Sequence, residues 1–570
     1  MWKNSIMAIQ QSLFEKVSFS SSKRGLQKEI SINDEVVISS IACQDTSFND
    51  VRDWWAAYLS QAQLPKVDPW SGKGKKLHVA ELFSGPGGLA QGVKTFCNDI
   101  GVNFQSVAAL DMNRDALRVY ERNHETLYRA SESDNDWRSH RGDVTKLVSG
   151  DWKNPKITKR VVDTHKEKGI NITSEDDWKR KKAAHRGLRT KWKRHQKLSQ
   201  RPTLSVKEIE ANYEINEPII NPDGPWNNIK EGAIDLLLAG PPCQGHSNLN
   251  NHSRRDDDKN ELYLVVPAVA FAWNIPLVII ENVEGVIHDV SGVVQQTEGL
   301  FKSYGYEVTR GVLAAHKMGW PQTRKRYFLI ARKKGDPIGI DEVMKSFSIH
   351  DDQPLGMRDA IFDLMDETTF TRDIEKKNVV TVGGTKHMFT VPKYSPKEAA
   401  RANYHARKTK RGKLDAVETL EKIFIKEGRL DKSVIRENFK RAKEEIRKRS
   451  LQDLLDDHNL PTRLHNITHW ENTTYPTVYG RLSWDKPSGT ITSGYMCSGR
   501  GRFTHPELGR TLTPMEAARL QGFPDSYDWK PENDRIPSAT DIAQWIGDAV
   551  PMPLGYAAAY SALGNGLDFK

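Results

Sequence analysis

Short apolar runs alternate along much of the chain with stretches whose apolar residues recur at helical spacing. The first such run, KLHVAELF at 76–83, predicts a buried strand, and the turn SGPGG follows it directly. The stretch 89–101 then predicts a helix with one apolar face. A second strand over 104–111 and a second helix from Asn113 repeat the pattern. This alternation favours parallel strands joined by helices.

Four more apolar runs predict the rest of a sheet. AIDLLLAG at 233–240 and PLVIIENV at 276–283 are apolar almost throughout, which is typical of strands buried on both faces. YEVTRGVLAA at 306–315 and RKRYFLIAR at 324–332 are close in sequence and predict an antiparallel pair at the sheet edge. The fold class that we expect is α/β, a doubly wound and mostly parallel sheet with helices on both faces.

Interruptions of this pattern suggest how the chain is divided. Residues 1–75 are expected to form an N-terminal extension and linker, and 76–346 the α/β domain. Within that domain, 127–232 is polar, basic and rich in tryptophan, which predicts an insertion. From 347 to 474 loops and charged helices predict a second, smaller domain, and 475–570 is compact again and is expected to rejoin the first.

Positive charge is concentrated in two segments. The chain has a net charge of +10, yet residues 151–200 hold 16 Lys and Arg against 6 Asp and Glu, and residues 401–450 hold 17 against 8. The remainder is therefore acidic. Two basic segments on an acidic body favour a polyanionic partner, and a merely solvated face is the alternative. Trp178 and Trp192 lie among the cations of the first segment, as in an arm that contacts phosphates.

Cysteine usage and hydropathy restrict the class of protein. The four cysteines lie far apart, without CxxC or Cys/His spacing for zinc, and Cys97 is expected in the core. Apolar stretches fall short of the ~20 residues that span a bilayer, and the N-terminus is a poor signal peptide. We therefore expect a soluble, intracellular protein with reduced thiols and no structural metal.

Residues that suit a cofactor follow the first two strands. The glycine-rich turn at 84–88 opens a helix at the end of a parallel strand, which is where doubly wound sheets bind nucleotides. Asp111 ends the second strand and can accept a hydrogen bond from a ribose hydroxyl, and Asp143 follows a further short strand. A cofactor that contains a nucleoside fits this pattern, and a phosphate is not required.

Three other motifs carry groups suited to catalysis. Cys243 lies in GPPCQGHS, where two prolines end the strand and hold the thiol on a turn; a small buried side chain is the alternative. Glu281 is an isolated acid at the end of an apolar strand, where burial would raise its pKa, unless it faces water. In QTRKR, Arg324 and Arg326 share one strand face, which points either to solvent or to an anion or carbonyl oxygen.

In order and spacing, these motifs resemble those of the cytosine-5 DNA methyltransferases of the bacterial restriction-modification type. The resemblance covers roughly 77–336 and 475–560. FSGPGG is similar to the family's S-adenosylmethionine loop, PPCQ to its nucleophile motif, ENV to its acid motif and QTRKR to its arginine motif. RLSWDKPSGTIT and HPELGRTLTPMEAARLQGFPD resemble the segments after the variable target-recognition domain, and IGDAVP resembles the last motif, which completes the cofactor pocket.

The resemblance implies a Rossmann-like, S-adenosylmethionine-dependent methyltransferase domain, with 347–474 as its target-recognition domain. It implies transfer of a methyl group to carbon 5 of a cytosine flipped out of duplex DNA. The catalytic residues that it implies are Cys243, Glu281, Arg324 and Arg326. The cofactor-binding residues that it implies are Phe83, Ser84, Gly85, Gly87, Gly88, Leu89, Asp111, Met112, Asp143, Val144, Pro242, Leu262, Asp548 and Ala549. The substrate-binding residues that it implies are Gln244, Ser247, Asn282, Gln322 and Thr490.

Partners and location follow from the same resemblance. It implies double-stranded DNA as the partner, a monomer on DNA, a cytoplasmic and nucleoid-associated location, and a role beside a restriction endonuclease or phage-defence proteins. Two other functions stay open, a tRNA cytosine-5 methyltransferase on the same scaffold and an inactive DNA-binding regulator. A recognition domain of well over 100 residues disfavours the first. The presence of Cys243, Glu281 and Arg326 disfavours the second.

Two positions depart from the family pattern. Asp548 follows Gly547 where the last motif usually has asparagine, and this change bears on cofactor affinity. Lys259 and Asn260 stand where another motif usually has Arg-Gly, and this change bears on loop ordering. Neither departure touches the catalytic residues.

Overall fold

A computed structural model gives the three-dimensional structure of the 570-residue chain. The residues that it describes are 17–22, 25–32, 35–41, 51–59, 65–124, 139–150, 156–157, 213–214, 218–242, 262–288, 292–349, 353–365, 369–372, 378–381, 480–497, 500–508, 510–531, 535 and 537–568. Within these ranges, no helix combines the length and the apolar character needed to cross a membrane.

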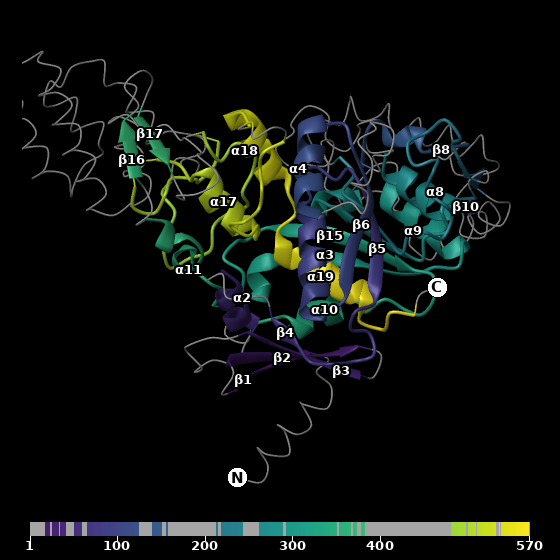
Figure 1. Cartoon of the computed structure of the whole chain (residues 1–570), viewed down its shortest axis with the longest axis horizontal. Helices are drawn as coiled ribbons and strands as arrows, with labels where there is room; N and C mark the ends of the chain where they lie inside the picture. Colours follow the sequence, from purple (N-terminus) through teal and green to yellow (C-terminus); the bar gives the residue numbers. More distant parts are fainter. Residues whose placement is uncertain are drawn as a thin grey trace, which may run out of the picture.

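Seven strands form a central sheet in the order β14-β15-β13-β12-β5-β6-β7 (Figure 1). Their bounds are β5 Lys76–Leu82, β6 Asn103–Asp111, β7 Ser139–Arg141, β12 Leu236–Ala239, β13 Leu277–Asn282, β14 Glu307–Ala314 and β15 Lys325–Arg332. The five strands from β13 to β7 are parallel, and β15 is antiparallel to β13 and β14. The mostly parallel α/β sheet is therefore confirmed. Of the predicted edge pair only β14 lies at the edge, because β15 also pairs with β13.

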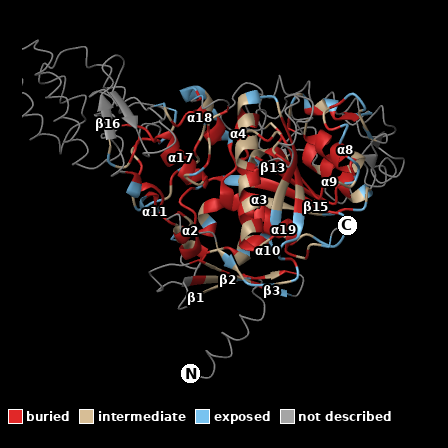
Figure 2. Cartoon of the chain, in the orientation of Figure 1, coloured by how far each residue is buried: buried red, intermediate tan, exposed pale blue. Residues whose placement is uncertain are grey.

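Successive residues of the buried strands enter two separate apolar cores, one on each face of the sheet. On β12, Leu236 and Leu238 belong to the first core, and Leu237 and Ala239 to the second. Helices of the first core include α3 Gly88–Asp99, α4 Arg114–His124, α10 Ile340–Ser346 and α19 Met552–Leu563. Helices of the second are α8 Val265–Ala272 and α9 Val293–Ser303. Buried residues accordingly run through the sheet and the helix faces turned to it (Figure 2).

The C-terminal part of the chain packs on the first helix of the α/β unit. A side chain at Gly92 of α3 would place its Cβ 2.7 Å from the Cα of Gly555 of α19, so both helices need glycine at this crossing. Two further helices, α17 Pro514–Gln521 and α18 Ala539–Asp548, lie in the same C-terminal part. Segments from the two ends of the sequence thus form one core.

The expected N-terminal extension contains a sheet that the sequence pattern did not predict. Its strands are β1 Val17–Ser22, β2 Gly25–Ile32, β3 Glu35–Ile41 and β4 Lys66–Val67, and helix α2 spans Val51–Leu59. Lys28 of β2 is fully buried and donates hydrogen bonds to Asp99 of α3 and to the hydroxyl of Tyr556 of α19. Its ammonium also lies 4.0 Å from the centre of the Trp54 ring. These contacts attach the small sheet to the α/β unit.

Parts of the two other predicted segments are also described. Strand β7 lies within the expected insertion, 127–232, so the central sheet takes a strand from that stretch. Short strand pairs there are β8 Val148–Ser149 with β11 Ile219–Ile220, and β9 Lys156–Ile157 with β10 Tyr213–Glu214. In the expected second domain, helix α11 spans Met357–Ile361, and β16 Thr369–Arg372 pairs with β17 Asn378–Thr381. The basic stretches 151–200 and 401–450 otherwise lie outside the described residues.

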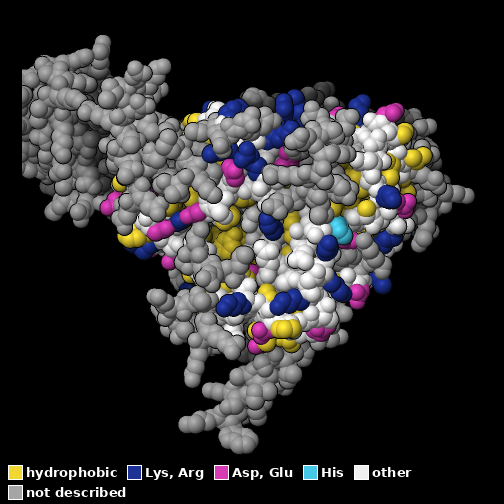
Figure 3. All heavy atoms as spheres, viewed as in Figure 1, with side chains coloured by type: hydrophobic (Ala, Val, Ile, Leu, Met, Phe, Trp, Pro, Cys, Tyr) yellow, Lys and Arg dark blue, Asp and Glu magenta, His cyan; other side chains and the backbone are white. Residues whose placement is uncertain are grey.

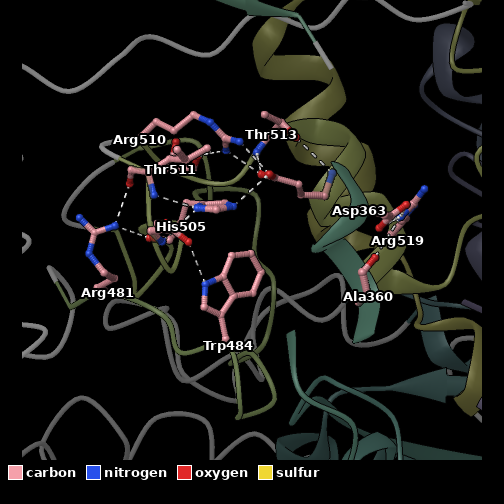
Figure 4. Close-up of polar contacts among 12 residues, drawn as sticks. Ala360, Asp363, Arg481, Trp484, His505, Arg510, Thr511, Thr513 and Arg519 are labelled. Atoms are coloured by element: carbon pink, nitrogen blue, oxygen red, sulfur yellow. Dashed lines mark hydrogen bonds and ion pairs between the residues drawn. The ribbon is translucent and has the colours of Figure 1, made fainter. Parts of the chain in front are cut away.

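Polar contacts hold both flanks of the expected second domain to helix α17 (Figure 4). Near the start of this domain, Asp363 accepts a hydrogen bond from Arg519 at 2.6 Å. On the following flank, the buried His505 lies 3.4 Å from Glu516, which also accepts two bonds of 2.7 Å from Arg510. One helix therefore fixes the points at which this segment leaves and rejoins the rest of the chain.

Candidate active site

The carboxyl ends of four neighbouring strands bring the predicted site motifs to one edge of the sheet. The glycine-rich turn follows β5, Asp111 ends β6, Pro241 follows β12 and Glu281 lies near the end of β13. These strands are parallel and adjacent, so residues that follow them end up close together although they are far apart in sequence. The topology thus places the strand ends that carry these motifs side by side.

The turn after β5 has an unusual backbone conformation. Phe83, Gly85 and Gly87 all have positive φ, at +56°, +50° and +93°. The left-handed conformation of Phe83 costs about 1–2 kcal/mol, so the surroundings must hold it. Asp111 contributes, because its Oδ2 accepts a hydrogen bond from the N–H of Gly85 at 2.9 Å. A Cβ at Gly85 would meet no atom within 4 Å, so the turn faces open space there.

Two acids lie at neighbouring strand ends beside this turn. Asp111 also accepts a hydrogen bond from the N–H of Asn113 at 2.7 Å, and burial raises the pKa of Asp111 although backbone donors oppose the shift. The N–H of Gly142 donates to the Asp111 carbonyl at 3.0 Å, which places the end of β7 beside β6. Asp143 follows, exposed, with its side chain accepting from the N–H of Thr145 at 2.9 Å. Each carboxylate keeps lone pairs for a ligand.

Other predicted cofactor residues lie around the same turn. A Cβ at Gly88 would lie 2.9 Å from that of Ala549, so the last motif meets the start of α3. Phe83 and Leu262 are both half-buried and pack against the second core. Asp548 and Met112 are exposed. The remaining predicted positions are buried or half-buried: Ser84, Leu89, Val144 and Pro242.

Glu281 and Arg326 form an ion pair at the same edge of the sheet. The Arg326 Nε lies 2.7 Å from Glu281 Oε1, and both side chains are mostly buried. Burial raises the pKa of Glu281, while the positive charges of Arg326 and Arg324 oppose this shift. Burial and the two nearby cations therefore act in opposite directions on this carboxyl.

Asn282 connects this pair to the segment that leads to Cys243. Its Nδ2 donates a hydrogen bond to the Pro241 carbonyl at 3.2 Å. A Cβ at Gly240 would lie 3.6 Å from Glu281 Oε2. Glu281 therefore lies beside the start of the PPCQ motif. Three predicted site residues of that motif lie outside the described residues: Cys243, Gln244 and Ser247.

Two predicted site residues bind backbone carbonyls of the C-terminal part of the chain. The buried Arg324 donates hydrogen bonds to the carbonyls of Ile491 at 2.6 Å and Gly547 at 2.8 Å. Gln322 is fully buried and donates to the Leu520 carbonyl at 2.9 Å. Both therefore hold the C-terminal part of the chain to the sheet, and a contact of either residue with the base stays a prediction. Thr490, next to Ile491, is half-buried.

Two residues near the glycine-rich turn were not predicted. The hydroxyl of Tyr527 donates a hydrogen bond to the carbonyl of Pro86, and His124 Nε2 lies 3.1 Å from the same hydroxyl. The sequence holds no local signal for this contact, because Tyr527 follows Pro86 by 441 residues.

The chain is similar in sequence to known proteins. The sequence matches the C-5 cytosine-specific DNA methylase family over residues 206–563. It is 28% identical over 496 residues to the Type II methyltransferase M1.BsuMI of Bacillus subtilis, covering 86% of this chain and 81% of that protein. The Type II methyltransferase M.AgeI of Thalassovita gelatinovora is 28% identical over 374 residues, covering 58% of this chain and 83% of that protein. Among solved structures, the S. pombe Dnmt2 methyltransferase aligns with 85% of this chain and 98% of its own, with 14% identity and a TM-score of 0.40.

Proposed function

The chain belongs to the C-5 cytosine-specific DNA methylase family, and on that premise we propose that it methylates carbon 5 of a flipped-out cytosine in a specific duplex DNA sequence. The methyl donor is S-adenosylmethionine. The target atom is hidden in a base stack, so the base must leave the duplex, at a cost of a few kcal/mol. Relatives named as Type II methyltransferases support a role in bacterial restriction-modification or phage defence.

The residues around the glycine-rich turn fit a cofactor of this kind. The open space at Gly85 allows close approach of a ligand to the backbone, and Asp111 has lone pairs for ribose hydroxyls. Phe83 and Leu262 offer partly exposed apolar surface to a base, and Ala549 closes the turn from the other side. When bound, S-adenosylmethionine supplies an electrophilic methyl group.

The chain's own groups prepare the cytosine to accept that group. Carbon 5 is a poor nucleophile until the Cys243 thiolate adds to carbon 6 and turns the ring into an enamine. Glu281 gives or shares a proton at ring nitrogen 3 as negative charge develops there. Arg326 orients Glu281 and faces the base carbonyl, while Arg324 positions the C-terminal part of the chain. Loss of the carbon-5 proton to a base, for which a bound water is suitable, then allows Cys243 to leave.

The ion pair of Glu281 with Arg326 is the observation that carries this proposal. It lies beside Pro241, which precedes Cys243 by two residues, and is held there by Asn282. A buried acid and a cation at one sheet edge, beside the segment that leads to Cys243, support this assignment of groups to the reaction.

Trapping of a covalent adduct tests the proposal. Duplex DNA with 5-fluorocytosine at the target should form a stable adduct with the natural chain and none with Cys243→Ala, because fluorine cannot leave as a cation. Cys243→Ala should still bind DNA through phosphate contacts. An adduct that persists in the variant contradicts the assignment of the nucleophile.

A parallel assay separates DNA from tRNA as the substrate. Sequencing of 5-methylcytosine in DNA and in tRNA from cells that express the chain should find methylation in a defined DNA sequence and none in tRNA. Methylated tRNA with unmodified DNA would favour the alternative function.

A further inference from the structure

Tyr527 reaches the glycine-rich turn from a distant part of the chain. Its buried hydroxyl donates a hydrogen bond to the carbonyl of Pro86, in the middle of the turn. The ring packs against Phe523 and Trp529, with ring centres 4.7 Å and 4.9 Å away. The aromatic cluster fixes the ring, so the hydroxyl has a defined direction.

The Pro86 carbonyl determines which way this hydroxyl donates, because a carbonyl oxygen only accepts. The single hydroxyl proton of Tyr527 is directed to Pro86, so the His124 Nε2, 3.1 Å away, must be the donor to the hydroxyl oxygen. Burial, with a smaller effect from Lys94, lowers the pKa of His124 to about 3, and the imidazole is therefore neutral at physiological pH. A hydrogen-bond chain then runs in one direction from His124 through Tyr527 to Pro86.

The same helix end is clamped to the segment that carries Tyr527. Asn123 donates to the Asp528 carbonyl at 2.8 Å and accepts from the Asp528 N–H at 2.8 Å. Arg122 adds an ion pair of 2.9 Å to the Asp528 side chain. These contacts hold the segment that carries Tyr527 against the helix end that carries His124.

The imidazole of His124 lies too close to the glycine-rich turn for a side chain at Gly87. A Cβ at Gly87 would lie 2.3 Å from His124 Nε2, so the imidazole rests directly on the backbone of the turn. Phe83 and Gly87 have left-handed backbone conformations, which persist only where several contacts enforce them. Asp111 supplies one such contact, at Gly85, and Tyr527 supplies another, at Pro86.

We propose that Tyr527, oriented by His124, is a positioning residue that holds the glycine-rich turn in the conformation that binds S-adenosylmethionine. This inference rests on the proposed function, which makes the turn a cofactor site. It assigns a role in cofactor binding to a residue from the part of the chain that follows α17. Tyr527 does not touch the reacting atoms.

Tyr527→Phe in the full chain, with Tyr306→Phe as matched control, tests the role. Tyr306 is equally buried and also donates to a backbone carbonyl, that of Ile275 at 2.7 Å, but it lies in the second core. Calorimetry should find that Tyr527→Phe weakens binding of S-adenosylhomocysteine about two- to tenfold, the range expected for one buried hydrogen bond. Tyr306→Phe should bind it as the natural chain does, and both should bind duplex DNA unchanged.

Two further measurements separate positioning from general destabilisation. Hydrogen exchange of the peptide 83–89, without ligand, should accelerate in Tyr527→Phe and not in Tyr306→Phe. His124→Gln keeps a donor for the hydroxyl and should preserve more of the affinity than His124→Leu.

Each outcome bears on a different claim. Equal affinities for the two tyrosine variants, or equal exchange of the peptide, would overturn the positioning role alone. If the natural chain itself fails to bind S-adenosylhomocysteine, the proposed function fails, and the inference that depends on it fails with it.

Discussion

Two arginines of one motif have different tasks in this molecule. Arg324 is buried and binds backbone carbonyls of the C-terminal part, including Gly547, whereas Arg326 binds the carboxylate of Glu281. They are two residues apart, yet Arg324 precedes β15 and Arg326 lies within it. At the scale of single residues, therefore, partners and not sequence spacing determine what a charged side chain does.

Arg326→Gln should move the pH dependence of methylation. The Arg326 cation lowers the pKa of Glu281 and opposes the rise caused by burial, so its loss should raise that pKa further. If protonated Glu281 is needed, activity falls as pH rises through its pKa, and the falling limb should move to higher pH in the variant. The maximal rate should drop roughly 10²–10³-fold. Single-turnover rates between pH 5 and pH 10 measure both effects.

Arg310→Gln is the matched control for this experiment. Arg310 Nε pairs with Glu298 Oε2 at 2.7 Å, the same geometry, on the neighbouring strand β14. Arg310→Gln should leave the falling limb of the pH–rate profile at the same pH as in the natural chain. If that limb does not move in Arg326→Gln either, a group other than Glu281 titrates.

At the scale of elements, the sequence predicted those strands that a local apolar run identifies. The apolar runs of β5, β6, β12 and β13 are long enough to identify strands buried on both faces, and their ends identify the site. The N-terminal sheet was not predicted because a charged residue, Lys28, interrupts the apolar pattern of β2. It occupies an inward position between Leu26 and Ile30. Its burial depends on Asp99, which is 71 residues away.

The same limit explains why the partners of two predicted site residues were not foreseen and why Tyr527 was missed. Gln322 and Arg324 belong to a motif with functional neighbours, but their partners lie more than 160 residues away. Tyr527 reaches its partner across an even longer separation. Local pattern can find a strand end, but it cannot tell which distant segment packs beside it.

Lys28→Met should destabilise the fold strongly. Among the described residues, it leaves the buried Asp99 with the Tyr556 hydroxyl as its one side-chain hydrogen-bond partner, and loss of one member of a buried ion pair costs about 3–5 kcal/mol. Lys28→Met combined with Asp99→Asn should recover part of this loss, because no buried charge is left without a counter-ion. Urea unfolding followed by fluorescence measures these differences.

Lys75→Met is the control for this prediction. Lys75 pairs with Asp568 at 3.5 Å, but both side chains are exposed, so the change should cost no more than about 1 kcal/mol. A comparable loss in both variants would show that Lys28 is not an anchor of the N-terminal sheet.

At the scale of the whole molecule, positive charge is unevenly distributed. Lysine and arginine side chains gather along the upper edge in Figure 3, over helices α4 and α18. The sequence adds two basic segments, 151–200 and 401–450, most of which lies outside the described residues. A molecule of this charge pattern is suited to a long polyanion.

Deletion of residues 151–200 should weaken DNA binding about equally for all sequences. The segment has a net charge of +10, and each phosphate contact that is lost removes about 0.9 from the slope of log K against log salt concentration. Binding titrations from 50 to 300 mM salt measure that slope. An unchanged slope would mean that the segment serves another partner.

Exchange of residues 347–474 for those of a relative with another target should transfer sequence specificity. The catalytic motifs treat every flipped cytosine alike, so discrimination must come from base-edge contacts, worth about 1–3 kcal/mol per good bidentate pair. Arg519 of α17 contacts Asp363 within this segment and Glu516 of α17 contacts His505 after it, so a graft that keeps an acid at position 363 should dock. Methylation mapping identifies the new target, and an active chimera that keeps the original target would place specificity elsewhere.

The close crossing of α3 with α19 has a consequence for the order of events during synthesis. A ribosome releases α3 early and α19 near the end, and Gly92 cannot meet Gly555 before then. Until that moment the apolar face of α3 lacks its natural cover, and chaperones have a surface to bind. The first core of the nascent chain therefore stays incomplete until residues 347–474, the proposed target-recognition segment, have also been translated.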